Sequence, residues 1–206
     1  MDNEEMNISA AETESAVQKE EGKSVVLDVG VVNQHPELPT GCEVTSLTML
    51  LNYYGVYADK CDIADNYLEK GDVGTVDFRQ AFGFTSFYEA NVGNPRSQYN
   101  SYGCYAPVIV NAANSYLSAR SSGYSAVEVS GQELEALFGY IDNGTPVMVW
   151  GTLDCRQGYP STVWNVDGRD LQWITPEHCM VLVGYSEDSV TVADPFYGEI
   201  RTFDIE

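Results

Sequence analysis

The chain has 206 residues and 44% hydrophobic content, which suits one domain of moderate size with a real core. Its formal net charge of −21 argues against nucleic acid and anionic lipid as partners, because both bind basic surfaces. A cationic or neutral partner such as a basic peptide remains compatible, and the simplest role of the charge is solubility. No apolar run approaches the roughly 18 residues of a membrane span.

Residues 1–24 form an acidic, polar segment with almost no large apolar side chains. This composition predicts a disordered or loosely helical tail. The segment lacks the basic start and apolar centre of a signal peptide. It fits a linker left after signal removal, a native tail or a pro-segment. We expect a tail or linker over 1–24 and one domain over 25–206.

The first elements lead to a helix that begins near Cys42. The β-branched run Val25–Val32 predicts a strand, and a proline-stiffened loop follows, in which Gly41 is small enough to let a substrate approach. Thr40 and Glu43 fit a capping box, which would place Cys42 in the first helical turn. Apolar residues at helical spacing supply a buried stripe before Gly55 ends the helix: Val44, Leu47, Leu50, Leu51 and Tyr54.

Two further helices are predicted in the first half of the chain. One runs from Asp59 to about Glu69, and the other from about Ala106 to Arg120 with Pro107 in its first turn. Between them, Gly71–Cys104 is rich in glycine, asparagine, serine and aromatic residues and shows little periodicity. So long an irregular segment is typical of a functional region, and we expect it to border a cleft.

The second half is mostly strands. A short strand over Ala126–Val129 precedes a helix that ends near Asp142, with Ser130 and Glu133 as its capping box. The strands expected after it are Pro146–Trp150, a hairpin from Trp164 to Trp173 turning at Asp167-Gly168, and the apolar runs His178–Tyr185, Ser189–Asp194 and Gly198–Phe203. Helices first and antiparallel strands last indicate an α+β fold.

Cysteine and histidine usage limits the chemistry. None of the five cysteines forms a CxxC pair, so we expect no zinc site, and the pairing of Cys61, Cys104, Cys155 and Cys179 stays open. There are only two histidines, His35 and His178, so any histidine-dependent reaction uses one of them.

Cys42 is the candidate nucleophile. The thiolate is the reactive form of cysteine, and the partial positive charge of a helix N-terminus favours that anion. A neighbouring imidazolium would lower the pKa of the thiol further and return the proton to a leaving group. The alternative is that Cys42 is a small buried hydrophobe, as most helical cysteines are.

His178 is the better candidate base, since His35 sits in a proline loop as a solvated residue. With the turn of the last hairpin centred near residue 187, position 178 pairs near 196, and Asp194 falls within two residues of that point. Facing side chains of paired strands are close together, so Asp194 is placed to accept the second imidazole N–H. The alternatives are a structural histidine and a turn-forming Asp-Pro. Gln34, eight residues before Cys42, is a weaker candidate for an oxyanion donor.

These residues together resemble a known family. The segments are Gln34, LPTGCEVTSLTMLLNYYGV, the strand GTPVMVW and the closing EHCMVLVGYSEDSVTVADPFYG. They resemble the papain-like cysteine peptidases, and more closely the bacterial family related to the double-glycine peptidases that cleave bacteriocin leaders. The resemblance covers about Val25 to Phe203. It implies a papain-like fold, with a Cys-bearing helix packed on an antiparallel sheet, and a triad of Cys42, His178 and Asp194 with Gln34 in the oxyanion hole.

The resemblance predicts a thiol-dependent hydrolase that cleaves peptide or amide bonds through an acyl-enzyme. We expect a peptide or protein substrate, no metal or organic cofactor, and a monomer as the favoured state. Trp150, Trp164 and Trp173 are either subsite or core aromatics. Leader peptidases proper are fused to an export ATPase, and this chain resembles free-standing, often exported relatives of Gram-positive bacteria. The alternatives are an acyl transferase or amidase on the same scaffold, and a catalytically silent surface binding module.

Overall fold

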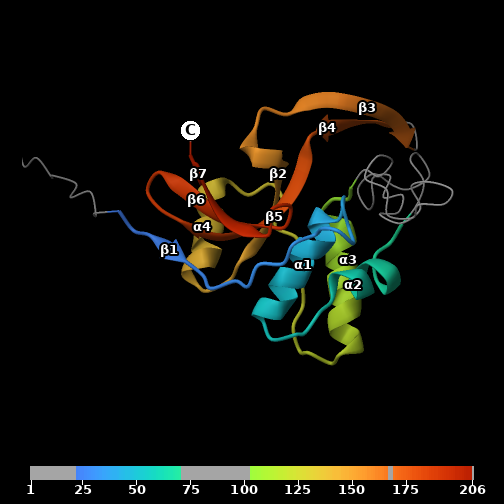
Figure 1. Cartoon of the computed structure of the whole chain (residues 1–206), viewed down its shortest axis with the longest axis horizontal. Helices are drawn as coiled ribbons and strands as arrows, with labels where there is room; N and C mark the ends of the chain where they lie inside the picture. The colour runs from blue at the N-terminus through green and yellow to red at the C-terminus, as the bar shows by residue number, and fades with distance from the viewer. Residues whose placement is uncertain (1–21, 71–102, 167–168, 206) are drawn as a thin grey trace, which may run out of the picture.

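The computed structural model describes residues 22–70, 103–166 and 169–205. Helices α1 (Cys42–Tyr53), α2 (Lys60–Asn66) and α3 (Ala106–Ala119) precede α4 (Leu134–Asp142), and most of the strands follow (Figure 1). The strands are β1 (Val25–Val26), β2 (Val147–Thr152), β3 (Tyr159–Val166), β4 (Arg169–Thr175), β5 (Glu177–Tyr185), β6 (Ser189–Asp194) and β7 (Glu199–Asp204), with a short 3₁₀ helix η1 (Leu153–Cys155) after β2.

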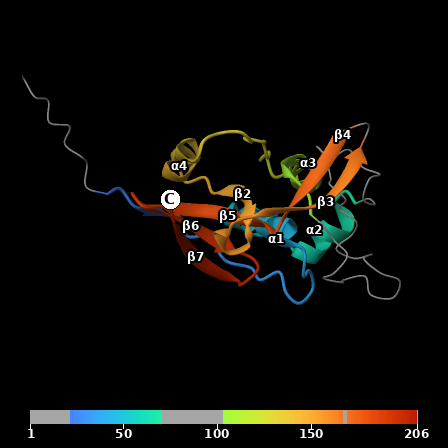
Figure 2. The same ribbon diagram turned by 90° about the horizontal axis from the view of Figure 1, so that it is seen from above.

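One five-stranded antiparallel sheet organises the molecule, with β5 at its centre. The order is β1-β5-β6-β7, and β2 pairs with β5 on the same edge as β1. Strands β3 and β4 form a separate ribbon that projects beyond this sheet (Figure 1 and Figure 2). Helices lead and antiparallel strands close the chain, so the α+β prediction is confirmed.

Strand β5 buries both of its faces, which explains its nearly continuous apolar run. Val181 and Val183 pack with Met49 of α1 on one face. Met180 and Leu182 pack with Ile141 of α4 on the other face. The three predicted closing strands are therefore present, and β5 lies between two helices.

Helix α1 begins at Cys42, but its N-terminus differs from the predicted capping box. The N-cap is Gly41, which makes no side-chain cap hydrogen bond, and the Thr40 hydroxyl is buried without a partner among the described residues. The Glu43 carboxylate turns inward and accepts the Cys104 N–H at 2.8 Å, so it is not available to cap the helix. The predicted stripe is otherwise confirmed: Val44, Leu47 and Leu51 are buried, and Gly55 follows the helix with a left-handed φ of 73°.

Several other boundaries differ from the prediction. Asp59 is the N-cap of α2, whose helix ends at Asn66, and its side chain accepts the N–H groups of Cys61 and Asp62. The capping box predicted at Ser130 and Glu133 is wrong, because α4 begins at Leu134 and its N-cap, Glu133, makes no side-chain cap hydrogen bond.

Of the two strands predicted at Val25–Val32 and Ala126–Val129, the first is much shorter than predicted and the second does not form. Strand β1 covers only Val25–Val26. Residues 126–129 form no strand, because the Asn114 side-chain amide takes both backbone groups of Ala126, at 3.0 and 2.8 Å. The β3–β4 hairpin is confirmed, with its turn at 167–168 outside the described residues. Residues 1–21 and most of the irregular segment, 71–102, also lie outside the described residues.

Candidate active site

His178 lies near the start of β5, where the strand is paired on one side with Gly151 of β2. Only 2% of the residue is exposed. Its Nε2 is 2.8 Å from Oδ1 of Asp194, which is fully buried at the end of β6. The contact predicted from the hairpin is therefore present. Val181 pairs with Ala193, so the register places residue 178 opposite 196 and Asp194 on the diagonal.

Asp194 is held as an anion. Burial alone would raise the pKa of this carboxyl, but hydrogen bonds from His178, Arg201 and the Phe196 N–H bring it below its usual value. The Phe196 N–H donates to Oδ1 at 2.9 Å, and Nη1 of Arg201 donates to Oδ2 at 3.0 Å. An ionised Asp194 accepts the Nε2–H of a neutral imidazole, which leaves Nδ1 as the basic nitrogen.

Cys42 is the first residue of α1 and is nearly buried, with 6% exposed. A side chain at Gly41 would meet Cβ of Leu38 at 2.6 Å, so the glycine before the cysteine allows the chain to pack on Leu38. The Cys42 thiol lies 3.1 Å from Oε2 of Glu43 and donates to it.

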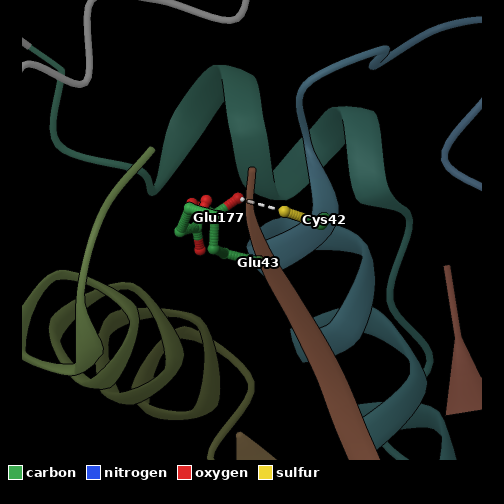
Figure 3. Close-up of side chains that lie close together, drawn as sticks. All are labelled: Cys42, Glu43 and Glu177. Atoms are coloured by element: carbon green, nitrogen blue, oxygen red, sulfur yellow. Dashed lines mark hydrogen bonds between the residues drawn. The ribbon is translucent and has the colours of Figure 1, made fainter. Parts of the chain in front are cut away.

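Two carboxyls lie beside this thiol. Oxygen atoms of Glu43 and Glu177 and the sulfur of Cys42 all lie within 4.8 Å of one another. Figure 3 shows the two carboxyl groups together, with the thiol directed at one of them. We call these three residues the carboxyl cluster. Glu43 comes from α1 and Glu177 from β5, so the packing of the helix on the sheet creates it.

Burial raises the pKa values of the carboxyl cluster. It raises the pKa of Glu43 to about 7, and it raises the pKa of Glu177 well above its ordinary value, with the Glu43 charge adding to the rise. Burial and then the charges of Glu43 and Glu177 also raise the pKa of the Cys42 thiol, against a hydrogen bond from the Cys179 backbone that lowers it. The expected thiolate at the helix N-terminus is therefore not the form that this arrangement favours.

The same three side chains carry ligand types that divalent metals accept, namely a thiol and two carboxyls. Glu43 uses both oxygens inside the protein, since Oε1 accepts the Cys104 N–H and Oε2 accepts the Cys42 thiol. Oε1 of Glu177 is buried with no partner among the described residues. Because Glu43 is already satisfied, we assign no metal to the cluster.

Gln34 is also buried, with 2% exposed. Its Nε2 donates to the Pro39 carbonyl at 2.6 Å, close to the start of α1, while Oε1 has no partner among the described residues. Its backbone N–H donates to the Pro195 carbonyl at 2.8 Å. Gln34 thus ties the loop before Cys42 to the residue after Asp194.

The structure brings Cys42 next to β5 but does not join it to the imidazole. The Cys42 thiol lies close enough to the backbone of Cys179, the residue after His178, for that backbone to lower the pKa of the thiol. Across the described parts of the chain there is no hydrogen bond between the Cys42 sulfur and the His178 ring, and none to Nδ1. His35 is linked to His178 only through Phe196, whose ring packs edge-on against both histidine rings, with centroid distances of 5.0 Å to His35 and 6.2 Å to His178.

Of the tryptophans predicted as subsite or core residues, Trp150 and Trp173 make structural contacts. Trp173 is buried and stacks at a tilt with Tyr105, while Nε1 of Trp150 donates to the Cys104 carbonyl at 2.8 Å. Both therefore support the segment that covers Glu43. The Trp164 side chain lies outside the described residues. All five cysteines are free thiols, with Cys155 exposed.

A cavity of about 540 Å³ lies elsewhere, between α1, α3, α4 and β2. Its lining is mostly apolar, and it includes Leu47, Ile109 and Trp150. None of the described residues that line it is Cys42, His178, Asp194 or Gln34. The cavity is therefore separate from the candidate site, and its lining includes exposed residues such as Tyr124 and Val127.

Sequence reasoning missed three residues that the geometry makes prominent: Glu43, Glu177 and Arg201. Glu43 was assigned to a cap, and Glu177 was only the residue before His178. A signal for Arg201 did exist. Val192 pairs with Arg201 and Asp194 with Glu199, so the alternation of β7 places Arg201 diagonal to Asp194.

Comparison with known proteins identifies the family of the chain. The model of the Peptidase_C39 like family matches residues 26–205. The chain belongs to this family. The uncharacterised protein YvpB of Bacillus subtilis strain 168 is 26% identical over 194 residues, which cover 92% of this chain and 73% of that protein.

A solved structure supports the same placement. The crystal structure of a candidate C39-like peptidase from Bacillus anthracis is 30% identical, covers 89% of each chain and superposes with a TM-score of 0.67. The papain-like α+β fold and the predicted family relationship are thereby confirmed. No helix among the described residues of this C39-like domain is long and apolar enough to cross a membrane.

Proposed function

We propose that this C39-like domain is a cysteine peptidase that cleaves a peptide or protein substrate. Cys42 is its nucleophile, His178 its base, Asp194 the residue that orients His178, and Gln34 a donor to the oxyanion. The observation that carries the proposal is the buried hydrogen bond of 2.8 Å between His178 and Asp194, in a chain whose family is described as peptidase-like.

The first step needs a turn of the Cys42 side chain. Its thiol now donates to Glu43, while Nδ1 of His178 has no hydrogen bond to the described residues. Rotation of the thiol toward Nδ1 lets the imidazole take the proton and leaves a thiolate, and Asp194 stabilises the imidazolium that results.

The thiolate then attacks an amide carbonyl of the substrate. The Cys42 N–H, in the first turn of α1, is one donor to the oxyanion. Gln34 is the other, because its amide has two N–H groups and only one donates to Pro39. His178 protonates the leaving amine, and water attacks the acyl-enzyme with His178 again as the base.

The test is labelling by a substrate-like reagent, a peptide amide that carries a thiol-reactive group. Cys155 is exposed, so the reaction is run in a Cys155→Ser protein and the labelled peptide is mapped by mass spectrometry. We expect label on Cys42 at pH 7 and roughly a 100-fold or greater loss in His178→Ala, because proton transfer in the transition state contributes on that scale.

His35→Gln is the matched control, since it removes the other histidine, which has no hydrogen bond to Asp194 among the described residues, and it should change the labelling rate far less than His178→Ala does. An absence of label on Cys42, or labelling that His178→Ala leaves unchanged, contradicts the peptidase proposal. It would favour a catalytically silent binding module on the same fold.

A peptide library with a free amine separates hydrolysis from acyl transfer. Both begin with the same acyl-enzyme and differ in the acceptor. Cleavage products with a free carboxylate support a peptidase. Incorporation of the added amine at the expense of cleavage would instead make the domain a transferase.

We also propose that residues 25–206 form a papain-like peptidase domain, that 1–24 is a tail or linker, and that the protein is secreted or on the surface of a Gram-positive cell. The support is the family match over 26–205 and relatives in two Bacillus species. Protease treatment of intact producing cells tests the location, since an external domain is degraded while cytoplasmic markers survive.

A further inference from the structure

Asp194 is bound on both oxygens, by groups from different elements. Oδ1 receives the His178 ring and the Phe196 N–H, and Oδ2 receives Arg201 at 3.0 Å. The Asp194 side chain is fully buried, whereas a quarter of the Arg201 side chain is exposed. Arg201 is therefore a cation at the edge of the site that reaches the inner carboxylate.

Arg201 is itself fixed in place. Its Nη1 donates to Oδ1 of Asp154 at 2.8 Å, and the Tyr197 hydroxyl donates to the same oxygen at 2.9 Å. The guanidinium carbon lies over the Tyr197 ring, 4.4 Å from its centroid, and 4.9 Å from that of Phe203. One nitrogen thus bridges two carboxylates, and two aromatic rings limit where the guanidinium can move.

Asp154 reaches Arg201 because of an unusual backbone in η1. Its φ is 60° and that of Cys155 is 51°, so both residues adopt the left-handed region, which few non-glycine residues do. Strained backbone of this kind is maintained where surrounding contacts determine it. Arg156 also binds Asp154, but no bond joins Arg156 to Asp194 among the described residues. This difference makes Arg156 a useful control.

We propose that Arg201 is a positioning residue for the base of this site, which acts by holding Asp194 ionised and aimed at Nε2 of His178. This inference rests on the proposed peptidase function for its kinetic effect, but its structural effect can be measured without any activity. Arg201 touches neither the substrate nor the nucleophile in this role. It acts through Asp194 on the tautomer of His178.

The charges around Asp194 support this role. The titratable groups that face it are His178 from β5, Asp154 and Cys155 from η1, Tyr197 from the loop after β6, and Arg201 from β7. Arg201 is the permanent cation of this set. Without it, a buried carboxylate beside a second carboxylate would gain from taking a proton, and a protonated Asp194 no longer selects the Nε2–H tautomer.

The experiment compares Arg201→Gln with Arg201→Lys and with Arg156→Gln. Nitrogen-15 spectra of the histidine side chains report the tautomer directly. The chain has only two histidines, and His35→Gln assigns them. We expect the wild-type protein to show the Nε2–H form of His178, Arg201→Gln to lose it, Arg201→Lys to restore most of it, and Arg156→Gln to keep it.

The kinetic arm uses the peptide substrate found by the library. We expect kcat to fall roughly 10- to 100-fold in Arg201→Gln, the scale that small errors in the placement of a catalytic group produce, with KM little changed. Arg201→Lys should recover most of the rate. A retained tautomer and an unchanged kcat in a folded Arg201→Gln protein would overturn the proposal, as would an equal effect of Arg156→Gln.

Two further outcomes are distinguishable. If wild-type protein neither labels on Cys42 nor cleaves peptides, the peptidase proposal fails while the spectra still decide the role of Arg201. If Arg201→Gln does not fold, Asp154→Asn takes its place, since it weakens the hold on the Arg201 guanidinium and keeps the positive charge of Arg201. We then expect a partial loss of the Nε2–H form, and an unchanged spectrum contradicts the proposal.

Discussion

Asp194 and the carboxyl cluster are two acidic sites near the start of β5, and their pKa values are shifted in opposite directions. Asp194 is fully buried yet ionised, because His178, Arg201 and a backbone N–H compensate its charge. In the carboxyl cluster, burial raises the pKa of both Glu43 and Glu177, and the Glu43 charge raises that of Glu177 further. His178 and Arg201 lower the pKa of Asp194, whereas no basic side chain among the described residues lowers the pKa of Glu43 or Glu177.

This comparison separates two roles for buried acids. A carboxylate that must accept a hydrogen bond from an imidazole needs a permanent countercharge, and Arg201 supplies it. A carboxyl that receives a thiol hydrogen bond can share a proton with a neighbour instead, as paired carboxyls do. Cys42 lies on the second side, and so its thiol must leave Glu43 before it can react.

The largest expected effect comes from breaking the compensated side. Asp194→Ala leaves Arg201 and His178 without their buried partner, and removing one member of a buried ion pair costs about 3–5 kcal/mol of folding free energy. Chemical denaturation of the variant and of the wild type measures this cost. Asp188→Ala, which changes an exposed acid in the β5–β6 turn, is the control and should be nearly neutral. A loss below about 1 kcal/mol in Asp194→Ala would show that the network stabilises little.

The raised pKa of Glu43 predicts that the folding stability of the protein falls as pH rises. The pKa of Glu43 is raised in the folded protein from 4.5 to about 7. As pH rises through this window, the unfolded chain loses the proton first, so the folded state becomes less stable. At about 1.36 kcal/mol per unit, the loss is on the order of 3 kcal/mol above pH 7, and it is absent below pH 4.

Glu177→Gln sharpens this second prediction, because it removes the ionisable group beside Glu43 and keeps the size and shape of the side chain. We expect the variant to be more stable than the wild type at pH 8 and equal to it at pH 4. Unfolding free energies measured across this range test it, with the exposed Glu199→Gln as control. Stability curves of wild type and Glu177→Gln that run parallel would contradict the shared-proton account.

The sequence alone was sufficient to predict the contact between His178 and Asp194, but it did not lead to Arg201. An antiparallel hairpin has its register set by a short local turn, so counting from residue 187 located Asp194 within two positions of the point opposite His178, on the diagonal. Counting one strand further would have reached Arg201. Asp154 was out of reach, because its approach depends on the left-handed backbone of η1.

The carboxyl cluster left no comparable signal. Glu43 and Glu177 are 134 positions apart and meet only because α1 packs on β5. In the sequence, Glu43 fits a capping box equally well, and that local pattern predicted the wrong partner. The tertiary hydrogen bond from Cys104 replaced the cap, since a buried N–H needs an acceptor and Glu43 was the group within reach.

The smallest expected effect tests how closely the cluster is packed. A methyl group at Gly103 would collide with Oε1 of Glu43 and lie 3.0 Å from both Oε2 of Glu177 and the Trp173 ring. Gly103→Ala should therefore cost about 1–3 kcal/mol, the usual cost of overpacking a core. Gly30→Ala is the matched control, because nothing lies within 4 Å of its added methyl and its effect should stay within about 0.5 kcal/mol. Equal unfolding free energies for the two variants would mean that the cluster has room to yield, and a looser cluster would release the Cys42 thiol toward His178 more readily.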